Sequence, residues 1–162
     1  TLMAYMDYGI KPDIVSKAKA LGGRMQIGAI CASEEVSRAF TEGAHGTTFG
    51  GHPVSCAAAL AEVDEIVSRK LPENAKKMGD YFAAGLNTIP HVKEVRHKGL
   101  LVGVEFDGSV DAIEIKHKCV DKKLLVTAIG NSIIRMVPPL IVTEKECDEA
   151  VRIIREAVEE LS

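Results

Sequence analysis

The chain has 162 residues, of which 46% are hydrophobic, 27% charged and only 4% aromatic. At about 100–200 residues per domain, this length predicts one domain or parts of two, and the composition is that of a globular protein rather than a disordered or fibrous one. With 20 basic and 23 acidic residues, the formal charge of -3 gives no support for sequence-independent nucleic-acid binding, which requires a basic face.

The sequence also lacks the roughly 20 consecutive apolar residues of a membrane-spanning helix, and its first residues carry no targeting signature. We therefore expect a cytoplasmic protein. The cysteines lie far apart, without a CxxC pair or a histidine at zinc-site spacing, so we expect four buried free thiols and no metal site: Cys31, Cys56, Cys119 and Cys147.

The first predicted elements are a short helix and a strand. Residues 9–20 are expected to form a turn and a helix, because Pro12 is placed to open it and apolar residues follow on one face. The continuous apolar run at 27–31 predicts a short buried strand. Ser33 is then placed to cap a helix whose first turn is acidic.

A glycine-rich segment follows and separates these elements from a long helix. Residues 41–52 contain too many glycines for a regular element, and Pro53 stands at the first position of the helix. From residue 72 the pattern changes to alternating helices and strands with a core of their own, so we expect a domain boundary near Leu71. The expected helices are 72–89, 110–123 and a last one opened by a capping box of Thr143 and Glu146, and the expected strands are 92–96, 100–106, 124–127 and 132–137.

Three polar clusters are candidates for chemistry, and the first is PDIVSKAKALGG. Lys19 lies just before two glycines, whose backbone permits the close approach of a ligand. An amine on a rigid element beside such a backbone can attack a carbonyl once desolvation has lowered its pKa. A surface lysine is the alternative interpretation.

The second cluster is HGTTFGGHP, which runs from His45 into the long helix. A glycine-rich loop with the hydroxyls of Thr47 and Thr48 can present N–H and O–H groups to a phosphate. A tight loop with Ser/Thr turns is the simpler interpretation. His45 and His52 have no carboxylate or cysteine in the loop that would complete a metal site.

The third cluster is IIRMVPPLIVT. Arg135 follows two isoleucines in an expected strand, so its guanidinium lies either on the exposed face of an edge strand or in a cleft. In a cleft it would be a bidentate partner for a carboxylate. From the residues alone, the exposed edge is favoured.

In this order, the three clusters resemble motifs of the class III, fold-type I aminotransferases, which depend on pyridoxal phosphate. PDIVSKAKALGGRMQIGA is similar to the family's active-lysine motif, HGTTFGGHP to its loop H-G-[ST]-T-[FY]-G-G-[NH]-P, and IRMVPPL to its [IL]-R-x-x-P-P-L. The resemblance runs from about Tyr5 to the end of the chain. It implies an α/β fold in which residues 1–70 are the end of the large cofactor-binding domain and residues 71–162 the small C-terminal α+β domain.

The resemblance also implies roles for four residues. Lys19 falls on the lysine that carries pyridoxal 5'-phosphate, and Arg135 on the arginine that binds the substrate carboxylate. Thr48, with Thr47 beside it, falls on the threonine that binds the cofactor phosphate across the interface of a homodimer. Two positions depart from the family pattern, because Arg24 and Gln26 stand where glycine and proline are usual.

Within the family, residues 125–150 are most similar to acetylornithine aminotransferases. The implied reaction transfers an amino group from acetylornithine or a similar ω-amino donor to 2-oxoglutarate, a step of arginine biosynthesis. An ornithine or 4-aminobutyrate aminotransferase shares all three motifs, and a non-catalytic interaction module derived from the family is a further alternative. We expect the chain to be the C-terminal half of such an enzyme and to be inactive alone, because the family's pyridine-binding aspartate, stacking aromatic and main phosphate loop precede it.

Overall fold

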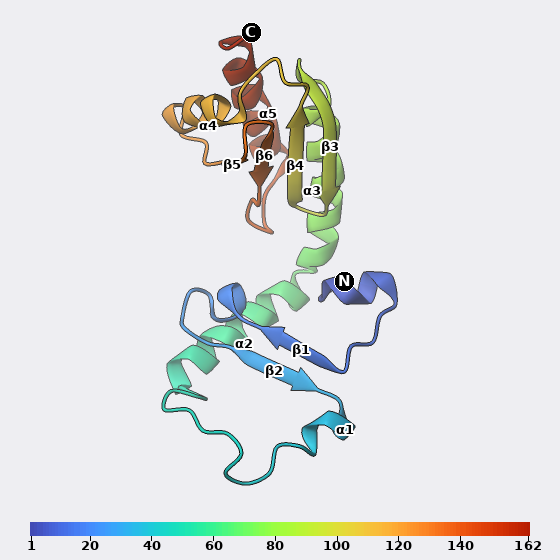
Figure 1. Cartoon of the computed structure of the whole chain (residues 1–162), viewed down its shortest axis with the longest axis vertical. Helices are drawn as coiled ribbons and strands as arrows, with labels where there is room; N and C mark the ends of the chain where they lie inside the picture. Colours follow the sequence, from blue (N-terminus) through green and yellow to red (C-terminus); the bar gives the residue numbers. More distant parts are fainter. The chain divides into compact units, whose positions relative to one another are not determined.

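The computed structural model describes residues 1–162, which divide into two compact units, Thr1–Lys70 and Leu71–Ser162 (Figure 1). None of the helices combines the length and apolar character that crossing a membrane requires.

The first unit is built around a two-stranded antiparallel sheet and a long helix. Its strands pair in a continuous register from Ile14 opposite Ala32 to Lys17 opposite Ala29. Two 3₁₀ helices and one short α-helix flank them. In chain order the elements are η1 (Ala4–Tyr8), β1 (Ile14–Lys17), η2 (Lys19–Gly22), β2 (Ala29–Ala32), α1 (Glu34–Ser37) and α2 (Pro53–Ser68).

The helix expected over residues 9–20 is not formed, and the prediction was wrong. The segment instead contains the strand β1 and, after Ala18, the start of η2. Ile14 and Val15 are β-branched and favour a strand once a partner strand is present, and β2 provides that partner. The apolar run was too short to distinguish the two structures from periodicity alone.

The local signals for the next two helices act as expected. Ser33 caps α1, and its Oγ accepts a hydrogen bond from the backbone N–H of Val36 at 3.4 Å. Pro53 occupies the first turn of α2, where its missing N–H costs no helical hydrogen bond. Residues 41–52 contain no helix or strand.

The second unit is a four-stranded antiparallel sheet with three helices. The strand order is β3-β4-β6-β5, so β6 is an interior strand and β5 an edge. In Figure 1, α3 and α5 lie behind the sheet. The elements are α3 (Leu71–Leu86), β3 (Val92–Lys98), β4 (Leu101–Phe106), α4 (Ala112–Asp121), β5 (Thr127–Ile129), β6 (Ile133–Met136) and α5 (Glu144–Glu159).

The hydrophobic core lies entirely in this second unit. Its three helices and the inward side chains of β4 and β6 supply it, among them Leu86, Val104, Ile115, Ile134 and Ile154, each fully buried. The expected capping box begins α5, since the Glu146 carboxylate accepts from the backbone N–H of Thr143 at 2.9 Å. Because this core is closely packed against one face of the sheet, the residues on the opposite, exposed face have defined positions.

The first unit buries much less of its apolar surface. Only Gly22 and Ser55 are buried there, whereas Ile30 is 66% and Phe49 79% exposed. The expectation of four buried thiols was wrong for this unit, because Cys31 and Cys56 are exposed. A two-stranded sheet and one long helix cannot enclose side chains on both their faces. Cys119 and Cys147 are buried in the core, where burial raises the pKa of the Cys119 thiol to about 11.

Candidate active site

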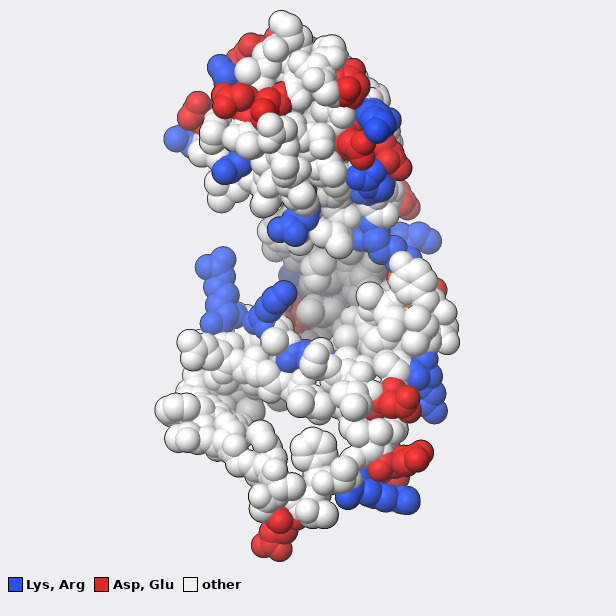
Figure 2. Space-filling model, viewed as in Figure 1, with Lys and Arg blue, Asp and Glu red and all other residues white.

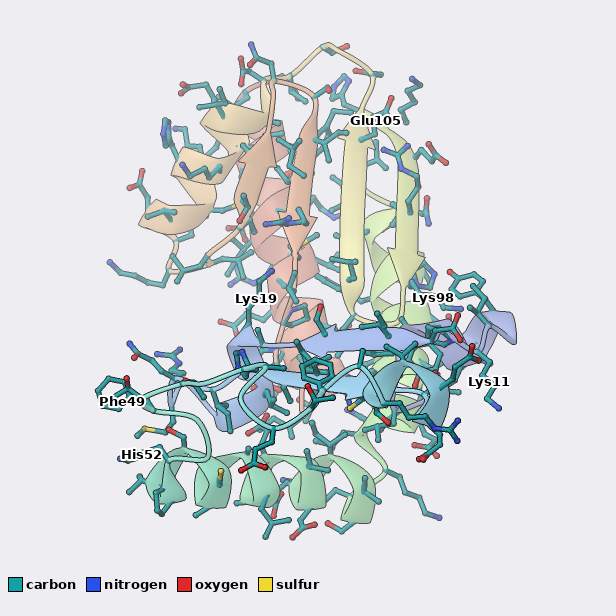
Figure 3. The ribbon with its side chains drawn as sticks, turned by 60° about the horizontal axis from the view of Figure 1, so that its bottom comes forward. Lys11, Lys19, Phe49, His52, Lys98 and Glu105 are labelled. Atoms are coloured by element: carbon teal, nitrogen blue, oxygen red, sulfur yellow. The ribbon has the colours of Figure 1, made fainter.

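Lys19 begins η2, and one residue, Ala18, separates it from the end of β1. Its backbone has φ 56, in the left-handed region that non-glycine residues rarely adopt, and its side chain is exposed. Figure 3 shows it projecting away from the two-stranded sheet. No hydrogen bond or ion pair within the chain engages its amine, which is therefore available to a ligand.

The turn after Lys19 is held by packing and hydrogen bonds. The N–H of Gly23 donates to the carbonyl of Ala20 at 3.0 Å, and that of Met25 to the carbonyl of Gly22 at 2.8 Å. A Cβ added at Gly22 would lie 2.7 Å from Cγ2 of Ile27, so only glycine fits this contact. The first of the two glycines thus closes the turn that presents the lysine.

Thr47 and Thr48 lie in the exposed segment between α1 and α2, and their hydroxyls have no partner within the chain. The segment folds back on itself here, since a Cβ at Gly50 would lie 2.1 Å from Cγ2 of Thr47. Phe49 and His52 mark the end of this loop at the start of α2 (Figure 3). Two free hydroxyls beside a helix start are suitable donors for a phosphate.

Arg135 lies on β6 in the second unit, with its side chain exposed between the buried Ile134 and Met136. The expected edge position was wrong, because β6 pairs with both β4 and β5. The side chain of Arg135 is exposed, as expected, but the reason is that no helix of this unit covers the face of the sheet on which it lies. Pairing with strands on both sides fixes the backbone from which the Arg135 side chain extends.

The register places four residues in one row across this exposed face: Arg96, Gly103, Arg135 and Thr127. Gly103, directly opposite Arg135, has no side chain, and the nearest atom to an added Cβ would be 4.0 Å away. The row therefore leaves open space beside the Arg135 guanidinium. A glycine inside a strand often marks such a place, where a ligand approaches closely.

The other arginine of the row is already paired. Arg96 donates to the carboxylates of Glu94 and Glu105, the latter at 2.8 Å, and Lys93 donates to Glu105 at 2.6 Å. These donors hold the pKa of Glu105 below its usual range. Arg135 has no such partner, so it is the free cation of the face.

The three motifs are therefore distributed over both units. Lys19 and the loop with Thr47 and Thr48 belong to the first unit, and Arg135 belongs to the second. On the face shown in Figure 2, basic side chains stand singly or beside acids and form no continuous basic surface. The interpretation of the motifs from sequence missed Gly103, although a glycine within an alternating strand was a visible signal.

Comparison with known proteins places this fold and these motifs in one family. Residues 1–158 match the family model described as Aminotransferase class-III, and the chain belongs to this family. Solved aminotransferase structures share its α/β fold, which is that of the fold-type I enzymes.

The most informative individual matches are acetylornithine and ornithine aminotransferases. The chain is 44% identical to the acetylornithine aminotransferase of Caldanaerobacter subterraneus subsp. tengcongensis, over 99% of this chain and 41% of the relative. Its structure is similar to that of acetylornithine aminotransferase from Elizabethkingia anophelis (TM-score 0.87, 31% identity, 99% of this chain and 42% of the other). It matches ornithine aminotransferase from Plasmodium yoelii with TM-score 0.87 and 31% identity, over 98% of this chain and 43% of the other. The chain thus spans about two fifths of the length of its relatives.

Proposed function

We propose that this chain forms the C-terminal part of a pyridoxal-phosphate-dependent aminotransferase that transfers an amino group from acetylornithine, or a similar ω-amino donor, to 2-oxoglutarate. Residues 1–70 would be the end of the large cofactor-binding domain and residues 71–162 the small C-terminal domain. The observation that carries the proposal is the exposed, unpartnered amine of Lys19 at the end of β1, within a chain of this family.

The donor set present in the chain fits pyridoxal 5'-phosphate. A primary amine is the group that condenses with the cofactor aldehyde, and Lys19 offers one without a competing partner. The hydroxyls of Thr47 and Thr48 would hold the phosphate. When bound, the cofactor supplies an electron sink that stabilises negative charge on the substrate carbon.

The residues of this chain would then perform three tasks. With its amine free, Lys19 would accept a proton from the substrate carbon at Nζ and later return one. Arg135 would bind the substrate carboxylate through two parallel N–H···O hydrogen bonds and so fix the orientation of the bond that breaks. The gap at Gly103 would admit that carboxylate.

The resemblance also supports a homodimer in which Thr48 reaches the phosphate held by the partner chain. The loop that carries Thr48 is suited to such a role, because it is exposed along its whole length and includes the 79% exposed Phe49. Aromatic side chains of this kind are frequent anchors of protein interfaces.

An ornithine aminotransferase is the second candidate, favoured by the similarity to the Plasmodium yoelii enzyme. The higher identity to acetylornithine aminotransferases supports the first. A 4-aminobutyrate aminotransferase and a non-catalytic module are further alternatives. The non-catalytic module would be identified if the protein did not bind the cofactor at Lys19.

The deciding experiment is a substrate panel on the complete gene product that contains this chain. Acetylornithine, ornithine, succinylornithine and 4-aminobutyrate are each offered with 2-oxoglutarate and pyridoxal phosphate, and acetylornithine is expected to give the highest kcat/KM. Lys19→Ala should abolish turnover and the visible absorbance of bound cofactor. Borohydride reduction that still fixed the cofactor to a different lysine would contradict the assignment of Lys19.

A further inference from the structure

One acidic residue lies next to Arg135 on the exposed face of the second unit's sheet. The register pairs Arg135 of β6 with Gly103 of β4, and Glu105 stands two residues farther along the same face of β4 (Figure 3). Residues on such a diagonal of an antiparallel pair are about 7–8 Å apart, within reach of long side chains. Glu105 could therefore form an ion pair with Arg135 and close the open position at Gly103.

Glu105 is the only acid among the strand positions around Arg135 on this face. Thr127 of β5 is directly opposite Arg135 on its other side. The remaining neighbours along β4, β5 and β6 are apolar: Leu101, Ile129 and Ile133. Whether the Arg135 guanidinium is free thus depends on what the Glu105 carboxylate contacts.

Both oxygens of the Glu105 carboxylate are engaged by cations of β3. Nζ of Lys93 donates to Oε1 at 2.6 Å, and Nη1 of Arg96 donates to Oε2 at 2.8 Å. These hydrogen bonds lower the pKa of Glu105, so its negative charge is neutralised by the two cations and not by a proton. Since β3 and β6 lie on opposite sides of β4, the donors draw the carboxylate away from Arg135.

Stabilisation of the sheet edge is the alternative role for these contacts. Glu94 of β3 is directly opposite Glu105, and like charges in that position are destabilising. Arg96 donates to both carboxylates and so offsets their repulsion. This role does not account for Lys93, which donates to Glu105 alone.

We propose that Lys93 and Arg96 are positioning residues, which hold the Glu105 carboxylate on the β3 side of the sheet and so keep the Arg135 guanidinium free for a substrate carboxylate. The inference rests on the proposed function, in which Arg135 binds that carboxylate. Without the two cations, Glu105 pairs with Arg135 and competes with the substrate.

The test removes both cations in the complete gene product and measures steady-state kinetics. In Lys93→Gln/Arg96→Gln, the KM of carboxylate substrates should rise about two- to sixfold, the factor expected when an exposed ion pair of ordinary strength competes for the guanidinium. The kcat should stay unchanged, because a bound substrate has already displaced Glu105. An unchanged KM would overturn the proposal.

Two triple variants separate competition by Glu105 from a general change of charge. Adding Glu105→Gln to the double variant should restore the wild-type KM, because the competitor is removed. Adding Glu94→Gln is the matched control, since it removes the same charge from the strand farther from Arg135 and leaves Glu105 in place; the KM should stay raised. Equal recovery in both triple variants, or none with Glu105→Gln, would overturn the proposal.

Chemical modification of Arg135 gives a second readout that does not depend on catalysis. Phenylglyoxal reacts with accessible guanidinium groups, and mass spectrometry of the peptide that contains Arg135 gives the rate at this residue. Modification should slow in the double variant and in the Glu94→Gln triple variant, and return to the wild-type rate with Glu105→Gln. A complete gene product without aminotransferase activity would overturn the proposed function, whereas these rates would still decide what Glu105 contacts.

Two single variants guard against an effect of lost stability. Arg96→Gln frees only one oxygen of Glu105, so it should raise the KM and slow modification to a smaller extent than the double variant. Arg152→Gln breaks an exposed ion pair with Glu156 on α5, away from the sheet face, and should change neither quantity. A rise in KM with Arg152→Gln as large as with Arg96→Gln would show that any lost ion pair of this unit has the effect, and would overturn the proposal.

Discussion

The open position opposite Arg135 leads to a prediction in which stability and activity change in opposite directions. Gly103 lies in β4 at a backbone φ outside the left-handed region, and the nearest atom to an added Cβ is the Arg96 carbonyl oxygen at 4.0 Å. The Cβ atom of a Gly103→Val variant therefore meets no steric obstacle. A β-branched residue in a strand is favoured over glycine, so the free energy of unfolding should rise by about 0.5–1 kcal/mol.

The same side chain would occupy the space beside the guanidinium. Residues in direct register on antiparallel strands have Cβ atoms about 5 Å apart, so the valine methyl groups would reach the approach to Arg135. Loss of one charge-assisted hydrogen bond to a carboxylate costs about 1.5–3 kcal/mol. The KM for carboxylate substrates should therefore rise by about tenfold or more.

Two assays check the two expectations. Thermal unfolding of the second unit, which has a core of its own, should shift upward by about 2–8 °C for that gain in free energy. Steady-state kinetics of the complete gene product should show the rise in KM. Leu101→Val is the matched control, since it changes a residue on the same face of the same strand without adding volume opposite Arg135. A Gly103→Val enzyme that is more stable and keeps its KM would refute the idea that the gap admits the carboxylate.

Three other predictions concern the recognition group, the two units and pH. Arg135→Lys should raise the KM of both half-reactions, because donor and acceptor each present a carboxylate and an ammonium group cannot make the bidentate contact. A raised KM for only one substrate would contradict the idea that Arg135 binds the carboxylates of both. The 162-residue chain alone should not catalyse transamination of acetylornithine with added cofactor. Amide hydrogens of residues 71–162 should be far better protected from exchange than those of residues 1–70, since the core lies in the second unit. Turnover by the chain alone, or uniform protection in a monomer, would show that the rest of the protein is less necessary. Hydrogen bonds from Lys93 and Arg96 lower the folded-state pKa of Glu105, so the ionised carboxylate stabilises the protein above its unfolded-state pKa of about 4.5, and this stabilisation is lost as the pH falls through the lower folded-state pKa. The denaturant midpoint should therefore fall less steeply between about pH 5 and 3 in Glu105→Gln than in wild type. Parallel curves of midpoint against pH would rule this contribution out.

The sequence by itself determined the features that depend on local chemistry. Ser33 and Pro53 mark helix starts because their effects act within one turn, and the structure has helices beginning at Glu34 and Pro53. The alternation in residues 100–106 was sufficient to predict β4, because one face of that strand is buried. The motif around Lys19 identified the family for the same reason, since it is carried by contiguous residues.

Only the tertiary structure decided the features that depend on pairing between distant segments. Ile14 and Val15 became a strand because β2 is available to pair with them, and Arg135 lies on an interior strand because β5 completes the sheet beside β6. The gap at Gly103 and the contacts of Glu105 with Lys93 and Arg96 are visible only once register and neighbours are known. Strand pairing is a non-local interaction whose partner the local pattern does not specify, so the motifs could name Lys19 and Arg135 but the open position opposite Arg135 could be recognised only from the strand register.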